Sequence, residues 1–364
     1  MAEERDTLLK EKTKMAWDTI PDAPWATAIP SAREPSRYLP QAIAHRGYKA
    51  SWPENTMGAF KGAVHVGAHA IETDVHLTRD GVAVLSHDAT LVRCFGVNKS
   101  LKDCDWDYLS TLETLREPKQ GLPRLQDLLE WLAQEDQLAG DHESRTWVLL
   151  DIKLDDDPHE LVSAISAAIS QVYSSTPWQK RIVLGCWNAS VLQAAHDILP
   201  SFPLAHIGYS LSYARHFLPV SNMAFNMAFH TLVRPIYGRR FMRDLLASGR
   251  PLYAWTVNHP RWMKWCIRQN VRRPLQQATP DSNSVKAIDG VVTDDPKLFL
   301  EICRRWEDEL DGSGVGEKRG ALGEAVELVL DIVKRHLSGK LIFWYRRHVQ
   351  GKLDYLDKER VKRD

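Results

Sequence analysis

The 364-residue chain has no excess of charge of either sign, because 47 Lys and Arg residues stand against 47 Asp and Glu residues. Proteins that bind nucleic acid usually carry a clear basic excess, so this balance argues against a nucleic-acid partner. The five cysteines form no CxxC pair and are odd in number. Scattered cysteines favour free thiols in a reducing compartment over a disulfide framework or a zinc site.

Long apolar segments are missing as well. The N-terminal stretch MAEERDTLLKEKTKMAWD is densely charged and lacks the apolar core of a secretory signal. No run approaches the roughly 18 apolar residues that a membrane-spanning helix needs. We therefore expect an intracellular protein that is neither secreted nor transmembrane. Peripheral contact with a membrane, on the cytosolic face of an organelle or on a lipid droplet, remains open.

Hydrophobic residues make up 44% of the chain, and many of them gather in short runs separated by helical stretches. Eight runs are almost continuously apolar, as parallel strands covered on both faces should be. Eight such strands with covering helices predict an α/β fold, a closed (β/α)₈ TIM barrel. The runs span residues 42–45, 70–75, 147–152, 182–186, 204–208, 223–229, 252–257 and 290–293.

One further apolar run, at 82–87, does not fit a parallel barrel. It follows the segment VHLTRDG, in which Asp80-Gly81 is a hairpin turn signal. The link is too short for a parallel crossover, which needs a dozen or more residues. We predict a hairpin on the barrel rim that brings His87 opposite Asp74.

The remaining segments suggest an extension on either side of the barrel. We assign residues 1–40 to an N-terminal extension and 41–306 to the barrel. Glycines and charges at 307–320 predict a flexible linker, and 321–364 a separate helical tail.

Acidic residues sit at the ends of several apolar strands. Glu72 and Asp74 are two residues apart and so share one face of a strand, and Asp151 belongs to the next barrel strand. Three acids facing one another need a cation, and carboxylate oxygens suit Mg²⁺ or Ca²⁺ better than zinc. We predict one divalent cation held by these acids; the alternative is that Arg46 and Lys153 neutralise them as salt bridges.

His45 and His87 come from different segments and are expected to face each other across this metal. Phosphodiester cleavage near neutral pH benefits from one group that accepts a proton and another that donates one, and imidazoles suit both tasks. Arg46 can hold phosphate oxygens bidentately, and Lys153 can stabilise transition-state charge. Trp255, at a strand end, packs either on the substrate's glycerol or lipid portion or in the core.

At these residues the chain resembles the glycerophosphodiester phosphodiesterase family. The resemblance covers about residues 41–300 and lies in AHRGYKASWPENTMGAF, IETDVHLTRDGVAVLSHDATLVR, GLPRLQDLLEWL, LLDIK, YAWTVN and DGVVTDDP. It implies a TIM barrel, a divalent cation on Glu72, Asp74 and the acid of LLDIK, and an acid/base pair of His45 and His87. It also implies that the glycerol 2-hydroxyl attacks phosphorus to give a cyclic phosphate, which water then opens.

Two departures from the family pattern matter. The family usually has Glu where this chain has Asp151, one methylene shorter, so that ligand can be more distant, water-bridged or compensated by the backbone. The stretch between Asp88 and Gly121 is short and leaves little room for a capping insertion. A less covered mouth, which suits a bulky lipid, is therefore expected.

The tail carries apolar residues at helical spacing, and LIFWY is followed by RRH. Such an aromatic and basic combination is expected at a bilayer interface, although a helix that docks on the barrel or on another subunit has the same pattern. With this tail the chain looks most like the fungal phosphatidylglycerol phospholipase C branch.

We therefore expect a metal-dependent phosphoric diester hydrolase that cleaves a glycerophospholipid, phosphatidylglycerol first among them, to diacylglycerol and glycerol phosphate. One alternative is a glycerophosphodiesterase that acts on soluble, deacylated glycerophosphodiesters and releases glycerol 3-phosphate and an alcohol. A second is a non-catalytic, membrane-bound scaffold.

Overall fold

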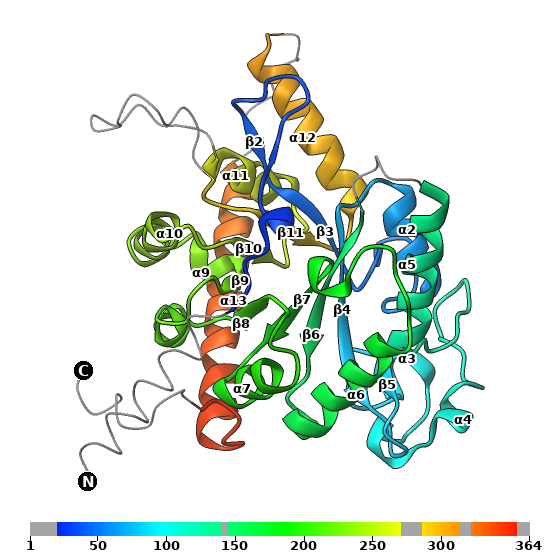
Figure 1. Ribbon diagram of the computed structural model, residues 1–364. Coiled ribbons are helices and arrows are strands. Elements are labelled where there is room, and N and C mark those ends of the chain that lie inside the picture. Colours follow the sequence, from blue (N-terminus) through cyan, green and yellow to red (C-terminus); the bar gives the residue numbers. More distant parts are fainter. Residues whose placement is uncertain (1–19, 140–144, 271–285, 313–321, 355–364) are drawn as a thin grey trace, which may run out of the picture.

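The computed structural model describes residues 20–139, 145–270, 286–312 and 322–354. Its centre is a barrel of eight parallel strands in the order β3-β11-β10-β9-β8-β7-β6-β4, closed by the pairing of β3 with β4 (Figure 1). The strands are β3 (Gln41–His45), β4 (Ala70–Leu77), β6 (Trp147–Ile152), β7 (Ile182–Cys186), β8 (Leu204–Gly208), β9 (Ala224–Ala228), β10 (Leu252–Trp255) and β11 (Gly290–Thr293).

The predicted barrel is confirmed, and each predicted strand end lies within two residues of the observed one. Nearly every residue of these strands is buried, because one face packs inside the barrel and the other against helices. Side chains alternate between the two layers. The inner layer includes Ile43, Leu149, Val183 and Val292, and the outer layer includes Ala42, Val148, Leu184 and Val291.

Helices and short helical turns surround the barrel. The longer helices are α2 (Met57–His65), α5 (Leu125–Ala139), α6 (Pro158–Ser170), α7 (Ala189–Ile198), α10 (Tyr237–Ala247), α11 (Pro260–Gln269), α12 (Pro296–Leu310) and α13 (Leu322–His348). The short ones are α3 (Val92–Phe95), α4 (Trp106–Leu109), α8 (Leu211–Ala214), α9 (Phe229–Leu232) and the 3₁₀ turns η1 (Pro24–Ala26), η2 (Leu101–Asp103), η3 (Trp178–Lys180) and η4 (Arg215–Phe217).

The N-terminal segment closes one end of the barrel. After η1, the two-residue strands β1 (Ile29–Pro30) and β2 (Tyr38–Leu39) pair with each other. Trp25 packs edge-on against Trp147 with ring centroids 5.5 Å apart, and the Tyr253 hydroxyl donates to the Ala26 carbonyl at 2.9 Å. Trp147 and Tyr253 lie at the amino-terminal ends of their strands, so the carboxyl end is the one left for a site.

The predicted rim hairpin is also present. Strand β5 (Ala83–Leu85) runs antiparallel to β4, with Val75 opposite Leu85. Gly81 in the turn has a φ of +82°, a left-handed conformation that glycine adopts without steric cost. The amide of Ser86 donates to the Asp74 carbonyl at 3.0 Å. Ser86 is thus the residue opposite Asp74, and His87, the next residue, lies one position beyond the predicted register.

Part of the expected domain organisation lies outside the described residues, namely residues 1–19 of the N-terminal extension, most of the 307–320 linker, and residues 321 and 355–364 of the tail. Helix α12 continues to Leu310 and so enters that linker. Among the residues that the structure describes, no helix is both long enough and apolar enough to cross a membrane.

Helix α13 lies against the barrel (Figure 1, orange to red), which is the docking arrangement left open above. It packs beside α9, and the Phe343 ring contacts Tyr213 and Tyr209 at centroid distances of 5.7 and 6.3 Å. A different side of the helix stays in solvent. On it, Leu337, Leu341 and Trp344 are 60%, 66% and 53% exposed; these three residues are called the outward stripe below.

Candidate active site

The turn after β3 is built by Arg46 and Gly47, which both adopt a left-handed backbone conformation, with φ values of +58° and +78°. A Cβ atom on residue 47 would lie 2.7 Å from Ala59, so glycine is required there. The turn points the amide of Arg46 at Glu72, whose Oε2 accepts its hydrogen bond at 2.9 Å. The His45-Arg46-Gly47 turn thus connects the end of β3 to an acid of β4 through a hydrogen bond.

The segment Pro53-Glu54-Asn55-Thr56 supports the same acids from the side. Glu54 accepts a 2.8 Å hydrogen bond from Arg46 Nη1, and Asn55 Nδ2 donates to Asp74 Oδ2 at 2.8 Å. The hydroxyl of Thr56 caps α2 by accepting from the Ala59 amide at 3.2 Å. Each polar residue of this segment therefore orients an acid or a cation of the site, or begins the helix behind it.

Glu72, Asp74 and Asp151 meet at the carboxyl end of β4 and β6. All three are buried, and one oxygen from each lies within 4.8 Å of the others. Lys153 Nζ contacts Asp74 and lies 2.7 Å from Asp151 Oδ2, and Arg46 Nε lies 3.2 Å from Asp74 Oδ2. The predicted acid cluster and the predicted salt bridges are therefore both present at one place.

Two cations do not neutralise this set of acids. Burial would raise the pKa of Asp74, but the charges of Lys153 and Arg46 outweigh it and hold that pKa well below its usual value. Burial, together with the charges of Asp74 and Asp151, instead raises the pKa of Glu72 well above its ordinary range. The negative charge on Glu72 is therefore the least compensated of the three, and a further cation would stabilise it. Three hard oxygen donors this close fit Mg²⁺ or Ca²⁺.

The two histidines are each oriented by a carboxylate. His45 Nδ1 lies 2.6 Å from Asp294 Oδ1, and His87 Nδ1 lies 2.7 Å from Asp88 Oδ1. In both rings this leaves Nε2 for proton transfer. Burial lowers the pKa of His45 and of His87, although the paired acids oppose the shift. Neutral imidazoles can accept a proton, and the carboxylates stabilise the charged form once it has formed.

Asp294 is a site residue that sequence reasoning missed. It lies in the segment DGVVTDDP, directly after β11, and its other oxygen accepts from Asn258 Nδ2 at 2.9 Å. The signal was its position at a strand end of the predicted barrel. Its partner His45 ends β3, which pairs with β11 although the two are the first and last barrel strands along the chain.

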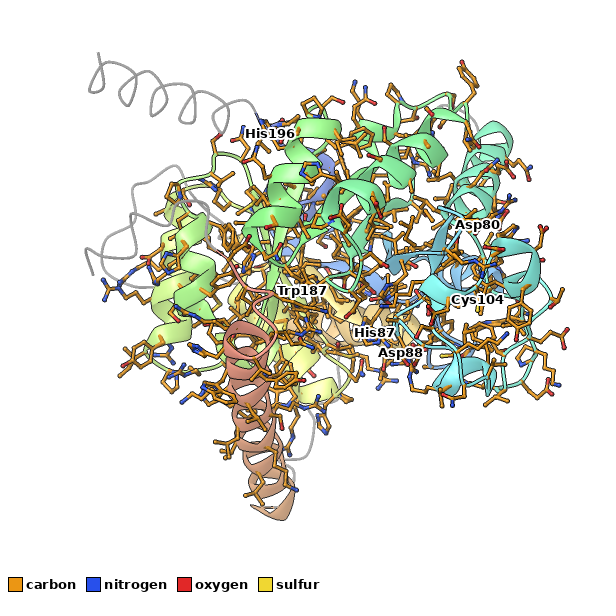
Figure 2. All side chains as sticks on the ribbon, turned by 90° about the horizontal axis from the view of Figure 1, so that it is seen from below. Asp80, His87, Asp88, Cys104, Trp187 and His196 are labelled. Carbon is orange, nitrogen blue, oxygen red and sulfur yellow. The ribbon has the colours of Figure 1, made fainter. Side chains whose placement is uncertain are left out.

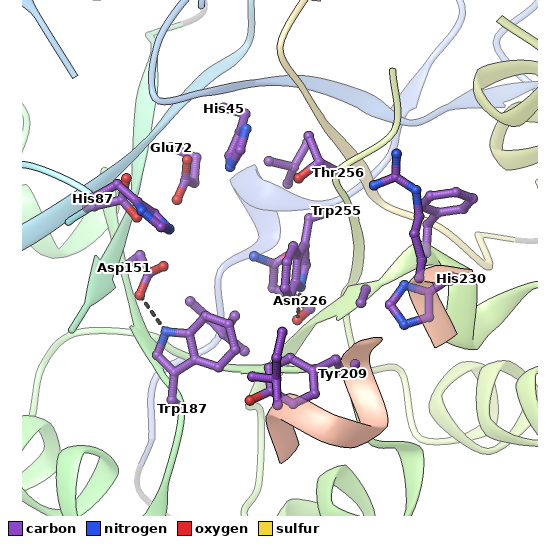
Figure 3. A pocket seen from close by; sticks show the side chains of 18 of the residues that line it. His45, Glu72, His87, Asp151, Trp187, Tyr209, Asn226, His230, Trp255 and Thr256 are labelled. Carbon is purple, nitrogen blue, oxygen red and sulfur yellow. Dashed lines mark hydrogen bonds between the residues drawn. The ribbon is translucent and has the colours of Figure 1, made fainter. Parts of the chain in front are cut away.

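All the predicted site residues line one cavity of about 480 Å³. His45, Glu72, His87 and Asp151 lie on one side of it, Trp187 lies beside Asp151, and Trp255 and Tyr209 lie further across the cavity (Figure 3). Trp255 Nε1 donates to the Asn226 carbonyl at 2.9 Å, which sets the indole against the cavity. With the molecule seen from below, Trp187, His87 and Asp88 lie near its middle, and Asp80 lies away from them (Figure 2).

Helix α13 supplies part of the cavity wall through Lys334, Arg335, Ser338, Gly339, Ile342 and Arg346. This wall was not predicted from the sequence, because it comes from a segment far along the chain rather than from an insertion between strands. A mouth less covered than in relatives with a capping insertion stays a prediction.

Comparison with known proteins agrees with this geometry. A family model described as "Glycerophosphoryl diester phosphodiesterase family" matches residues 45–273. A glycerophosphodiester phosphodiesterase of Caldanaerobacter subterraneus subsp. tengcongensis is 27% identical over 271 residues, which cover 72% of this chain and 97% of that protein. A lysophospholipase D of Homo sapiens is 44% identical over 85 residues, which cover 22% and 27%.

Solved structures share the fold. A putative glycerophosphoryl diester phosphodiesterase from Silicibacter pomeroyi superposes with a TM-score of 0.61 at 20% identity, covering 77% of this chain and 96% of that one. A phosphodiesterase from Oleispira antarctica, solved with the product sn-glycerol-3-phosphate, gives 0.57 at 18% identity, covering 73% and 97%.

Replacing either His45 or His87 with alanine should abolish phosphodiester cleavage, because each removes one partner of the proposed acid/base pair. Loss of one such group typically lowers the rate about 10²- to 10⁴-fold. Asp294→Asn should lose less, since it disturbs only the orientation of His45. Turnover of glycerophosphodiesters is the measurement, with His65→Ala, an exposed histidine on α2, as the matched control. A substantially active His45→Ala protein would remove His45 from the mechanism.

Excess EDTA should abolish phosphodiester cleavage, because the three buried acids are expected to hold a cation. Adding Mg²⁺ or Ca²⁺ should restore the activity. Glu72→Gln should weaken cation binding in a calorimetric titration, whereas Glu130→Gln, on the exposed side of α5, should not. Full activity in excess chelator would show that no metal is needed.

Proposed function

This chain belongs to the glycerophosphoryl diester phosphodiesterase family and is a phosphoric diester hydrolase, and we propose that it cleaves a glycerophospholipid at a membrane surface. Phosphatidylglycerol is the first candidate, with diacylglycerol and glycerol phosphate as products, as in the fungal phosphatidylglycerol phospholipase C branch. The observation that carries this proposal is α13, which forms a wall of the cavity on one side and presents the outward stripe to solvent on another.

The outward stripe supports an interfacial role for this helix. Leu337, Leu341 and Trp344 are not needed for docking, because the docking contacts come from Phe343 and neighbours on a different side. Exposed apolar and aromatic side chains beside Lys340 and Arg347 are the combination that binds the boundary between headgroups and acyl chains. A helix placed this way would bring the mouth of the cavity close to the lipid layer.

The cavity supports a substrate larger than glycerol phosphate. Its volume of about 480 Å³ lies in the range of pockets that enclose drug-sized ligands. The buried acids, Arg46 and Lys153 line one part of the cavity, where a phosphate can bind, and aromatic rings and the basic side chains of α13 line the rest. We assign phosphate binding to Arg46 and Lys153, and contact with the glycerol or lipid portion to Trp255.

The proposed reaction has two steps. In the first, one histidine takes the proton of the headgroup's glycerol 2-hydroxyl, whose oxygen attacks phosphorus. The bond from phosphorus to the diacylglycerol oxygen breaks, and the second histidine protonates that oxygen. In the second step water opens the cyclic phosphate, and His45 and His87 exchange their roles. A divalent cation on Glu72, Asp74 and Asp151, when bound, would stabilise charge on the phosphoryl oxygens.

A soluble glycerophosphodiester is the second candidate. Relatives named glycerophosphodiester phosphodiesterases support it, and so does the Oleispira antarctica structure with its glycerol-3-phosphate product. The same residues would act, and only the group that leaves from phosphorus would differ.

Mass spectrometry of products separates the two candidates. Incubation with mixed phospholipid vesicles should give diacylglycerol and glycerol phosphate, with phosphatidylglycerol consumed first. Parallel incubation with deacylated lipids, such as glycerophosphocholine, should give product measurably but more slowly. Release of glycerol 3-phosphate from the deacylated set alone would contradict the lipid assignment and favour the soluble candidate.

Introducing negative charge into the outward stripe tests whether this stripe binds a bilayer. The double change Leu337→Glu/Leu341→Glu should reduce sedimentation with phosphatidylglycerol vesicles several-fold, because charged side chains resist insertion at the apolar boundary. Hydrolysis of a soluble diester should change little. Leu115→Glu is the control, since Leu115 is 61% exposed and lies outside α13. Unchanged sedimentation of the double variant would show that α13 does not bind membranes.

A further inference from the structure

Trp187 connects the acid cluster to the C-terminal helix. It follows β7, and its indole Nε1 donates to Asp151 Oδ1 at 2.6 Å. The indole is 9% exposed and packs edge-on against Trp255 with ring centroids 5.6 Å apart. Figure 3 shows this hydrogen bond reaching from the aromatic side of the cavity to Asp151.

This hydrogen bond helps to orient Asp151, which stands where the family usually has the longer Glu. The shorter Asp side chain brings its carboxylate less far from β6 than a Glu would. Trp187 holds one oxygen, and Lys153 holds the other at 2.7 Å. With a donor on each oxygen, the carboxylate has one preferred orientation toward Glu72 and Asp74.

Arg346 of α13 lies over the ring of Trp187. Its guanidinium carbon is 5.5 Å from the centre of the Trp187 ring, a cation–π contact. Arg346 also lines the cavity, next to Tyr209. Burial raises the pKa of the Tyr209 hydroxyl, and the nearby Arg346 charge opposes that shift. Helix α13 thus places the guanidinium group of Arg346 against the indole that donates to Asp151.

The residues that follow α13 hold the same two loops. Lys352 Nζ lies 2.6 Å from Asp155 Oδ1, and Asn188 Nδ2 donates to the Lys352 carbonyl at 2.6 Å. Asp354 Oδ1 accepts from the Ala189 amide at 2.9 Å, at the start of α7. Asp155 lies just beyond Asp151 and Lys153, and Asn188 follows Trp187. The segment after α13 therefore contacts both the loop that follows Asp151 and the loop that follows Trp187.

We propose that Arg346 is a positioning residue of the metal site: it packs on Trp187, and Trp187 in turn orients Asp151 for the cation. Residues on the outer side of a site that orient metal ligands commonly tune metal affinity. The proposal deepens, and rests on, the proposed metal-dependent phosphodiesterase function. It also means that the site is completed by residues beyond the 45–273 segment that the family model matches.

The test measures cation binding without substrate, by calorimetric titration of the full chain with Mg²⁺ and, separately, with Ca²⁺. Trp187→Phe keeps the ring but removes the indole donor, and it should weaken binding about 10-fold. Arg346→Ala should weaken binding several-fold, and Arg346→Lys should restore most of the loss because it keeps a cation over the ring. Lys340→Ala, exposed on α13 and not part of the cavity wall, should bind as the wild type does.

A double-mutant cycle distinguishes positioning from general destabilisation. If Arg346 acts through the indole, Arg346→Ala should cost nothing further in a Trp187→Phe background. An additive loss, or wild-type affinity in Arg346→Ala, would overturn the proposal. Thermal melting of each variant checks that the fold persists. A wild type that binds the cation but cleaves no phosphodiester would contradict the proposed function alone, and the titrations would still decide the role of Arg346.

Discussion

Three buried carboxylates on two adjacent strands are the constraint on which the rest of the site depends. Like charges this close repel one another in a poorly solvated place, so every neighbouring group serves to compensate or orient them. Lys153 and Arg46 supply positive charge, while Asn55, the Arg46 amide and the Trp187 indole supply hydrogen bonds. The raised pKa of Glu72 marks the least compensated charge, and a divalent cation bound by the three acids would stabilise it.

Two segments outside the barrel strands, η1 and α13, complete the surroundings of the three acids. Residues of η1 close the amino-terminal end, and the polar groups of the site lie at the carboxyl end. Helix α13 then covers one side of that end and contacts Trp187 through Arg346. A helix whose pattern suits a membrane is thus also a wall of the cavity. Docking uses one side of α13 and leaves the outward stripe in solvent, so both roles are compatible.

Much of this was accessible from the sequence. The eight strands were predictable because burial on both faces demands continuous apolar runs, and the rim hairpin because Asp80-Gly81 leaves no room for a crossover. Glu72, Asp74, Asp151, His45 and His87 stood out as polar residues at the ends of apolar strands, and the structure brings them to one cavity. Asp294 was missed because its partner lies about 250 positions away. The cavity wall that α13 supplies was not predicted, because nothing in the local sequence shows where a distant helix docks.

The sequence by itself determined the barrel, the acid cluster and the histidine pair, since periodicity, turn chemistry and strand-end polarity are local properties of the chain. Only the tertiary structure decided which carboxylate orients each histidine, which donor holds Asp151, and what covers the cavity. Those contacts join β3 to β11, β6 to the loop after β7, and the barrel to α13. They arise from closure of the sheet and docking of a terminal helix, where partners far apart in sequence meet and no local pattern records the pairing.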